Sequence, residues 1–473
     1  MPSPKLLVAN RGEIACRVIR AARSLGLLTV AVYSEADADL PHVALADEAV
    51  AIGPARAAES YLNGERIVQA ARQTGATLLH PGYGFLSERA SFAQLCHDNG
   101  IRFVGPSAAV IRLMGDKDRA RAAAVEAGVP VLPGSKKLVI ADAAAVTSAG
   151  KATGFPLLVK AAAGGGGIGM RTVASADQLA AAVAATSGMA LKAFGDGAVY
   201  LERMVQRARH VEIQVFGFGD GTAVHLFERD CSLQRRHQKV IEEGPAPEIP
   251  ADVRSALAEA AVKLAESCAY QGAGTVEFLY DTQSREFFFL EMNTRIQVEH
   301  PTTEMITGID LVAAQLRLAM GERLNEALAQ ARIRTNGHAV EARVYAENPA
   351  RNFMPSPGTL TRFRVPESAH LRIETGYREG NRVTPFYDPM VMKVIAHGPD
   401  RQTAIERLLG ALRQVEIEGI VTNIPYLLTV LACANFRAAD VYTNLLADQH
   451  AVLAGPAPVT AKTMALPPSS SSG

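Results

Sequence analysis

The chain has 473 residues, 48% of them hydrophobic, which is too long for one compact core and sufficient for two or three packed domains. Lys plus Arg and Asp plus Glu are balanced at 48 each, without a long block of one sign, so charge gives no reason to expect a nucleic-acid or anionic-membrane partner. The 5 cysteines form no C-x-x-C pair and no run of about 18 apolar residues occurs, so we expect a protein of the reducing cytoplasm outside any membrane.

The first hundred residues alternate short β-rich runs with an amphipathic segment. The runs are "KLLVAN" and "LLTVAVY", and between them Ile14, Val18 and Ala22 follow helical spacing. This strand, helix, strand order predicts a parallel sheet. The later runs "ATLLHPGYG" and "GIRFVGPS" read as further strands that end in glycine loops, the usual place for a ligand in an open α/β sheet.

Four consecutive glycines, from Gly164 to Gly167, follow the apolar run that Lys160 ends. The β-like "MRTV" stands where the dinucleotide fingerprint needs a helix, and Met170 occupies the lysine position of a P-loop, so both familiar phosphate loops fail. What remains is a hairpin whose backbone N–H groups can close over phosphates, because glycine has no side chain to keep an anion away. The alternative is a flexible surface loop, and a metal site and a base elsewhere would favour the phosphate interpretation.

A second predicted hairpin, "GTVEFLYDTQSREFFFLEMN", places two acids opposite each other. If it is symmetric about Ser284, Glu277 and Glu291 face each other with Cβ atoms about 5 Å apart, where like charges are destabilising unless something compensates. With the amide of Asn293 they form a set of hard oxygen ligands that suits Mg²⁺. The four apolar residues before Glu291 favour a buried strand. The alternative is two glutamates on a solvated strand face.

The segment "NTRIQVEH" follows at once. Arg295, Gln297 and Glu299 have a spacing of two, so an extended chain would point all three to one side. A guanidinium, an amide donor and a carboxylate base together suit a site that activates a small anion. The polar run "ERDCSLQRRHQKVIEE" adds Gln234 and Lys239. The alternatives are scattered polar residues on a loop and a solvated charged face.

Long motifs in order resemble one family. "ANRGEIACRVIRAA", "HPGYGFLSE", "MGDKDRAR", "ERDCSLQRRHQKVIEEGPAP" and "EMNTRIQVEHPTTEMITGIDLV" are similar to the biotin carboxylase component of biotin-dependent acyl-CoA carboxylases such as acetyl-CoA carboxylase. The resemblance implies an α/β (α+β overall) ATP-grasp fold. Its parts would be an N-terminal Rossmann-like α/β domain at 1–115, an ATP-grasp region at 116–335 with a small mobile lid at about 131–204, and a β-rich C-terminal domain at 336–446. The Pro- and Ser-containing end, 447–473, has almost nothing to bury and is predicted as a disordered tail.

The resemblance also implies a reaction: ATP- and bicarbonate-dependent carboxylation of biotin, the first half-reaction of an acyl-CoA carboxylase. Glu299 would deprotonate bicarbonate, which attacks the γ-phosphate of ATP to give carboxyphosphate. Carboxyphosphate breaks down to CO₂ and phosphate, the phosphate removes the ureido proton of biotin, and Arg343 stabilises the biotin enolate. The implied cofactors are ATP, Mg²⁺ (or Mn²⁺) and biotin supplied by a carrier protein. The implied partners are a biotin carboxyl carrier protein, a carboxyltransferase subunit and a second copy of the chain.

Motif positions carry the remaining site residues over from the family. The residues implied to bind ATP and its metal are Lys117, Lys160, Gly164, Gly165, Gly166, Gly167, Glu202, Val205, His210, Gln234, His237, Glu277, Glu291 and Asn293. The residues implied to bind bicarbonate or biotin, or to act in catalysis, are Lys239, Arg295, Gln297, Val298, Glu299 and Arg343. The glycine loop departs from the family pattern, since Ala163 replaces the first of five glycines and Ile168 replaces a cation. This difference bears on lid closure and ATP affinity, not on the reaction.

Lys393 in "DPMVMKVIAHG" resembles a biotin-attachment lysine, but no separate small β domain surrounds it, so we expect biotin to arrive on another protein. Two other functions stay open at this point. An ATP-grasp ligase that joins a carboxylate to an amine shares the ATP half of the site but has no need for "RIQVE". A non-catalytic nucleotide-binding scaffold would use the lid without chemistry.

Overall fold

A computed structural model of the whole chain describes residues 4–138, 143–161, 170–194, 197–236, 238–449 and 453. The loop glycines Gly164, Gly165, Gly166 and Gly167 lie outside the described residues, as do His237 and most of 447–473. Among the described residues, none of the helices has the length and apolar character needed to span a bilayer.

The N-terminal domain is a parallel sheet with the strand order β3-β2-β1-β4-β5, which confirms the predicted parallel sheet. Leu6, Leu7 and Val8 are fully buried because helices cover both faces of such a sheet. Its strands are β1 (Lys5–Val8), β2 (Leu28–Tyr33), β3 (Glu48–Ala51), β4 (Leu78–His80) and β5 (Arg102–Phe103). Its helices are α1 (Gly12–Ser24), α2 (Pro41–Leu45), α3 (Gly64–Thr74), α4 (Ala90–Asp98) and α5 (Ala108–Met114), with short 3₁₀ turns η1 (Glu35–Asp37) and η2 (Ala57–Glu59).

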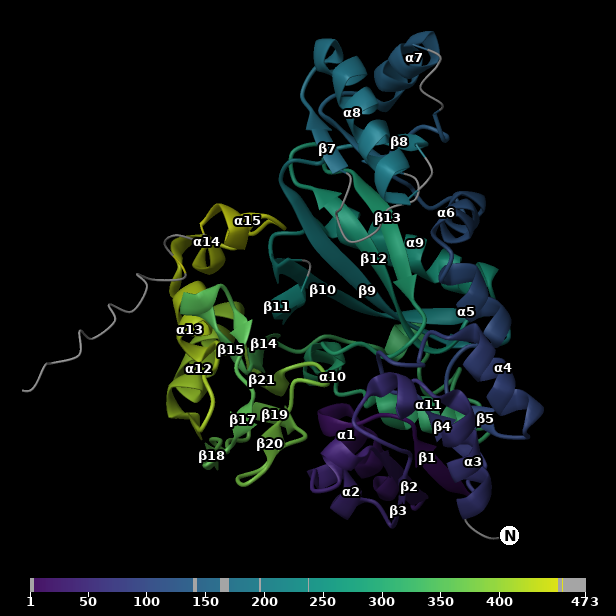
Figure 1. Cartoon of the computed structure of the whole chain (residues 1–473), viewed down its shortest axis with the longest axis vertical. Helices are drawn as coiled ribbons and strands as arrows, with labels where there is room; N and C mark the ends of the chain where they lie inside the picture. The colour runs from purple at the N-terminus through teal and green to yellow at the C-terminus, as the bar shows by residue number, and fades with distance from the viewer. Residues whose placement is uncertain are drawn as a thin grey trace, which may run out of the picture.

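A small unit lies at the top of Figure 1, beyond the large sheet. It is reached through α6 (Lys117–Glu126) and consists of α7 (Ala143–Thr153), β6 (Leu157–Ala161), β7 (Met170–Val173), α8 (Ala176–Phe194) and β8 (Val199–Arg203). Its core is its own, and Leu157, Val159 and Val173 are fully buried in it. Strands β6 and β7 pair antiparallel with Lys160 opposite Met170, so the two strands predicted to flank the glycine run do form a hairpin.

An eight-stranded antiparallel sheet forms the centre of the molecule, in the order β13-β12-β9-β10-β11-β14-β21-β19. Its strands are β9 (Ala208–Phe218), β10 (Ala223–Arg235), β11 (Gln238–Gly244), β12 (Gln271–Asp281), β13 (Phe287–Asn293), β14 (His338–Tyr345), β19 (Leu371–Thr375) and β21 (Met390–Gly398). Associated with it are α9 (Ala251–Ser267), α10 (His300–Thr307), α11 (Leu311–Ala319) and η3 (Gln330–Arg332). Because β11 pairs with β14, Ile241 opposite Ala342, one continuous sheet crosses the boundary expected at 335.

Helices of the C-terminal part share one hydrophobic core with β14 and β21 of the large sheet. These helices are α12 (Arg401–Gln414), α13 (Ile424–Ala432), α14 (Ala434–Arg437) and α15 (Leu445–Asp448). Short pieces complete it: β15 (Glu347–Asn348), η4 (Pro349–Arg351), β16 (Met354–Pro355), β17 (Gly358–Thr359), β18 (Arg362–Arg364), β20 (Arg382–Val383) and β22 (Glu416–Glu418). Helix α15 reaches into the segment predicted as a tail, and Leu453 is also buried in this core.

Candidate active site

A row of charged side chains crosses four strands of the large sheet. Arg229 on β10 lies opposite Glu212 on β9, Glu212 lies opposite Glu277 on β12, and Glu277 lies opposite Glu291 on β13. The prediction that Glu277 and Glu291 face each other is therefore confirmed. Three carboxylates in adjacent positions repel one another, and a single guanidinium at one end of the row does not neutralise them. The row needs further positive charge.

Lys239 supplies part of that charge. Its Nζ lies 2.6 Å from Glu212 Oε2, 3.0 Å from Glu277 Oε1 and 2.6 Å from Glu299 Oε1. Burial alone would lower the pKa of Lys239, but the three carboxylates outweigh burial and raise it well above its usual range. In turn Lys239 lowers the pKa of Glu277 against the effect of burial. The Lys239 ammonium on β11 thus joins carboxylates of β9, of β12 and of the segment before α10.

Glu291 has no such partner among the described residues, and a strand irregularity sets it apart. Glu277 pairs with Glu291 and Phe278 pairs with Phe289, so Leu290 is skipped and the strand bulges there. Leu290 and Glu291 are exposed as a result, and the buried strand predicted at this point is wrong for these two residues. Partial burial and the facing charge of Glu277 raise the pKa of Glu291.

The "NTRIQVEH" segment is a bend and a turn, so the extended chain predicted from its spacing is wrong. Arg295 Nη2 donates to Asn293 Oδ1 at 2.8 Å, and its Nε donates to Glu88 Oε2 at 3.0 Å. Gln297 Nε2 donates to Glu277 Oε1 at 2.8 Å. Both side chains therefore reach the surroundings of the carboxylate row, but through folding of the backbone and not through strand alternation.

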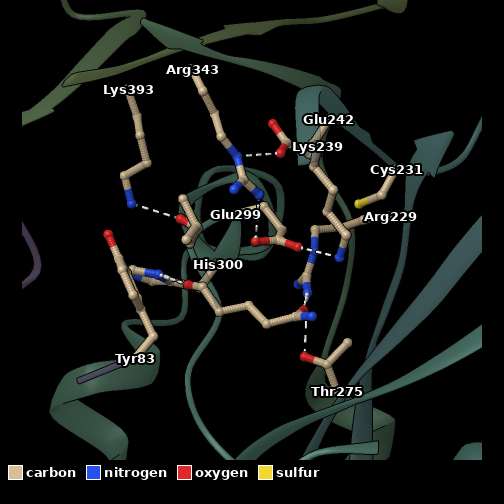
Figure 2. A network of polar contacts seen from close by, with 12 residues as sticks. Tyr83, Arg229, Cys231, Lys239, Glu242, Thr275, Glu299, His300, Arg343 and Lys393 are labelled. Atoms are coloured by element: carbon tan, nitrogen blue, oxygen red, sulfur yellow. Dashed lines mark hydrogen bonds and ion pairs between the residues drawn. The ribbon is translucent and has the colours of Figure 1, made fainter. Parts of the chain in front are cut away.

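Glu299 is 2% exposed and is held between two cations (Figure 2). Its Oε1 accepts a hydrogen bond from Lys239 Nζ at 2.6 Å, and its Oε2 accepts one from Arg343 Nη2 at 3.0 Å. The Nε of Arg343 lies 2.6 Å from Glu242 Oε1. Burial would raise the pKa of Glu299, but Lys239 and Arg343 outweigh burial and lower it, so Glu299 is a carboxylate at neutral pH.

The side chains expected to bind nucleotide fall into two groups. Lys160 on β6 and Glu202 on β8 form an ion pair in the small unit. On the large sheet, Gln234 Nε2 lies 3.0 Å from His210 Nδ1, and His210 Nε2 lies 3.1 Å from Glu277 Oε2. Burial would lower the pKa of His210, but Glu277 outweighs it and the pKa is raised to about 9. Among the described residues, no hydrogen bond or ion pair joins the two groups.

Three other residues expected at the site lie in simpler surroundings. Lys117 begins α6 and is exposed, and its charge partly opposes the raised pKa of Glu291. Val205 is half-buried between β8 and β9. The carbonyl oxygen of Val298 accepts a hydrogen bond from Lys393 Nζ at 2.6 Å. Lys393 is fully buried.

Several buried residues of this cluster were not singled out from the sequence. Arg229 donates to Glu212 at 2.7 Å and to Gln297 at 2.7 Å and is fully buried. A signal existed for Glu212, because "RHVEIQVF" places polar residues at a spacing of two within an apolar strand. No comparable local signal marks Arg229 or Glu242, whose partners come from distant strands.

Comparison with known families gives three consecutive matches along the chain. Residues 2–111 match the model described as "Biotin carboxylase, N-terminal domain". Residues 116–327 match "Carbamoyl-phosphate synthase L chain, ATP binding domain", and residues 341–448 match "Biotin carboxylase C-terminal domain".

Individual proteins with similar sequences agree with these matches. The chain is 49% identical over 446 residues to biotin carboxylase 2 of Bacillus subtilis, covering 94% of this chain and 99% of that protein. It is 49% identical over 447 residues to the mitochondrial methylcrotonoyl-CoA carboxylase subunit alpha of Rattus norvegicus, covering 94% of this chain and 62% of that subunit. The chain therefore matches all but the ends of the first relative and less than two thirds of the second.

A solved structure is similar over the same length. The biotin carboxylase domain dimer of 2-oxoglutarate carboxylase from Hydrogenobacter thermophilus, in complex with MgADP, ADP and bicarbonate, has a TM-score of 0.84 and 44% identity. The alignment covers 94% of this chain and 97% of that one.

Proposed function

The chain belongs to the biotin carboxylase family, whose members carboxylate biotin with ATP and bicarbonate, and we propose that this chain does so with Glu299 as the base. The observation that carries the proposal is the position of Glu299, a buried carboxylate held at 2.6 Å by Lys239 and at 3.0 Å by Arg343. Two cations beside one carboxylate attract an anionic substrate to the atom that accepts its proton.

The anion site is assigned to residues around this carboxylate: Lys239, Arg295, Gln297, Glu299 and the backbone of Val298. Transfer of a proton from bicarbonate to a Glu299 carboxylate oxygen makes a bicarbonate oxygen nucleophilic toward the γ-phosphate of ATP. The new C–O–P linkage is that of carboxyphosphate, and ADP leaves. Because carboxyphosphate is hydrolysed easily, water must be excluded from the site, and the small unit at about 131–204 is proposed as the lid that does so.

The pair of facing carboxylates beside this site suits a divalent cation. Glu277 and Glu291 face each other on neighbouring strands. Burial and the charge of Glu277 raise the pKa of Glu291, and a bound cation would relieve this conflict. We assign Mg²⁺ (or Mn²⁺) to Glu277 and Glu291 with the help of Asn293. A different group, His210, Glu212 and Glu277, brings ligand atoms within 4.8 Å of one another, but Mg²⁺ prefers oxygen ligands, which favours Glu277, Glu291 and Asn293. When bound, the ion would neutralise phosphate charge.

The nucleotide is assigned to the space between the small unit and the large sheet. Lys117, Lys160, Gly164, Gly165, Gly166 and Gly167 are proposed for the phosphates, and Glu202, Val205, His210, Gln234 and His237 for the adenosine part. In the structure Lys160 pairs with Glu202, so nucleotide binding would exchange this ion pair for contacts of each side chain with ATP. Arg343 is proposed to stabilise the biotin enolate.

The chain is a component of a larger carboxylase system, since similar sequences occur both as separate biotin carboxylases and within longer subunits. We propose a biotin carboxyl carrier protein and a carboxyltransferase subunit as partners, a homodimer as the assembly, and the cytoplasm as the location. The divisions 1–115, 116–335 and 336–446 are retained as proposed functional parts, although the large sheet joins the last two.

The test is ATP hydrolysis with Mg²⁺, measured with and without bicarbonate and free biotin. The proposal expects hydrolysis to require bicarbonate and to respond to biotin. Glu299→Gln should lower turnover by about 10² to 10⁴ while ATP binding persists, since a general base contributes about that factor. Glu228→Gln is the matched control, because Glu228 is a buried glutamate of β10 whose ion pair, at 2.8 Å, is with Arg254 on α9 and not with a residue assigned to the site.

Hydrolysis independent of bicarbonate and biotin would contradict the proposal. An amine requirement in place of bicarbonate would identify a carboxylate–amine ligase. If the chain were a non-catalytic scaffold, Glu299→Gln would change neither ATP binding nor ATP hydrolysis.

A further inference from the structure

Lys393 is a fully buried ammonium group that the reaction described above does not use. It lies on β21, and its Nζ donates to the carbonyl oxygen of Val298 at 2.6 Å. The same Nζ forms an ion pair with Glu13 Oε1 on α1 at 3.0 Å. An ammonium buried to this degree is strongly destabilising unless it is paired and hydrogen-bonded. Its retention next to the site therefore calls for a specific reason.

Glu13, the partner of Lys393, is nearly buried at 6% exposure and ties a third segment to the same point. The hydroxyl of Tyr83, which follows β4, donates to Glu13 Oε1. Glu13 Oε2 is buried without a hydrogen-bond partner among the described residues. The N-terminal domain thus contacts β21 of the C-terminal part and the Val298 segment through one carboxylate and one ammonium group.

The carbonyl group that Lys393 binds belongs to the peptide between Val298 and Glu299. A hydrogen bond at 2.6 Å to this peptide fixes the backbone immediately before the Glu299 Cα. Arg343 lies directly opposite Lys393 on the neighbouring strand β14 and binds the Glu299 side chain. Figure 2 shows the two side chains reaching from the sheet toward the same segment. One cation therefore holds the side chain of Glu299, and the other holds its backbone.

This arrangement has an electrostatic cost that Glu13 offsets. Like charges directly opposite each other on neighbouring strands are destabilising. Arg343 has Glu242 and Glu299 as counter-ions, whereas the ion pair of Lys393 is with Glu13. Removing the charge of Glu13 would leave the buried Lys393 ammonium without its ion-pair partner, with Arg343 opposite it on β14 and Glu374 opposite it on β19.

We propose that Lys393 and Glu13 are positioning residues that orient Glu299 as the base. Lys393 fixes the peptide before Glu299, and Glu13 holds Lys393 in place while connecting it to Tyr83. The alternative is an ordinary buried ion pair that stabilises the fold without affecting the chemistry. The inference rests on the proposed function, because it concerns the base of that reaction.

The experiment is a steady-state comparison of bicarbonate-dependent ATP cleavage by the full chain. Lys393→Met should lower kcat by about 10², the loss expected when a reacting group is displaced by about 1 Å, and should change KM for ATP by no more than about two-fold. Glu13→Gln keeps an oxygen for Lys393 and Tyr83 but removes the charge, and it should lower kcat by about ten-fold. Arg401→Met is the control, because it too removes the cation that pairs with a buried carboxylate, here Glu243 on β11.

A Lys393→Met enzyme that keeps kcat within about two-fold of wild type would overturn the inference, as would an equal loss of kcat in Arg401→Met. Should Lys393→Met not fold, Glu13→Gln decides, and an unchanged kcat in that variant would overturn the inference. The wild-type assay separates the two proposals. Absence of bicarbonate-dependent cleavage in wild type refutes the proposed function, whereas an active wild type with an equally active Lys393→Met refutes only the positioning role.

Discussion

Glu242 and Glu243 are neighbours on β11 that face opposite sides of the sheet, and their carboxyls have opposite pKa shifts. Burial raises the pKa of Glu242 to about 7, although Arg343 opposes this. Burial acts in the same direction on Glu243, but His338 at 2.8 Å and Arg401 at 2.6 Å outweigh it and lower the pKa to about 2. Replacing each glutamate by glutamine should therefore change the pH dependence of stability in different ways.

The pKa of Glu242 lies above its ordinary value of 4.5 in the folded protein. Between 4.5 and about 7 the folded protein keeps a proton that the unfolded chain has released, so the free energy of unfolding falls as the pH rises. At about 1.4 kcal/mol for each pKa unit, the loss is on the order of 3 kcal/mol. Glu242→Gln removes this loss, so its stability relative to wild type should improve between about pH 5 and pH 8.

The pKa of Glu243 lies below its ordinary value of 4.5, so its effect on the free energy of unfolding changes with pH in the opposite direction. Its stabilisation is fully present above 4.5 and is lost as the pH falls toward about 2. Glu243→Gln should therefore lower the free energy of unfolding by on the order of 3 kcal/mol, with little further change between about pH 5 and pH 8.

Urea unfolding of wild type and both variants at several pH values measures these differences. The reasoning would be refuted if the free energy of unfolding changed equally with pH in the two variants. It would also be refuted if the difference in this free energy between Glu242→Gln and wild type did not grow with pH.

Three further predictions concern the site. Arg343→Ala should reduce carboxylation of free biotin by about 10² and bicarbonate-dependent ATP cleavage by less, since it removes one donor to the developing enolate; equal losses in the two assays would argue against its role. Glu291→Gln should raise the Mg²⁺ concentration for half-maximal activity about ten-fold, because one of two facing carboxylates loses its charge, and an unchanged Mg²⁺ titration would remove Glu291 from the metal site. Lys160→Met should weaken ATP binding about ten-fold, as measured by calorimetry, and leave Tm unchanged. Tm should not change because the ion pair of Lys160 with Glu202 is partly exposed and contributes little to stability. A lower Tm with unchanged ATP affinity would contradict this prediction.

Local patterns in the sequence predicted those parts of the fold that depend on local geometry. The hairpin symmetry around Ser284 placed Glu277 opposite Glu291 because strand register follows from the turn and the alternation. The helical spacing after the first strand likewise placed α1 and a parallel sheet. In both cases the relevant contacts join residues close in sequence.

The parts that escaped prediction depend on distant partners or on irregular backbone. The family resemblance placed Lys239 in one set with Glu299, but nothing near Lys239 in the sequence specifies its contacts with the carboxylates of β9 and β12. Two predictions assumed regular strand alternation: the buried strand at Glu291 and the extended "NTRIQVE". The bulge at Leu290 and the turn before α10 interrupt this alternation. A periodicity argument holds only while the backbone stays regular.

Directly opposed like charges recur across the large sheet, in the pairs Glu212 with Glu277, Glu277 with Glu291, Glu242 with Glu341, and Arg343 with Lys393. Most of these side chains have an oppositely charged neighbour, but Glu291 and Glu341 have no ion pair with a described residue. These two carboxyls differ in solvent exposure, and each therefore relieves the repulsion in a different way. Glu341 is 0% exposed, and burial together with Glu242 raises its pKa well above the usual range, so it resolves the conflict by keeping a proton. Glu291 is exposed, so a hydrated cation can reach it and stabilise its charged form. The same electrostatic conflict therefore leads to a neutral carboxyl inside the sheet and to a candidate metal site at its edge.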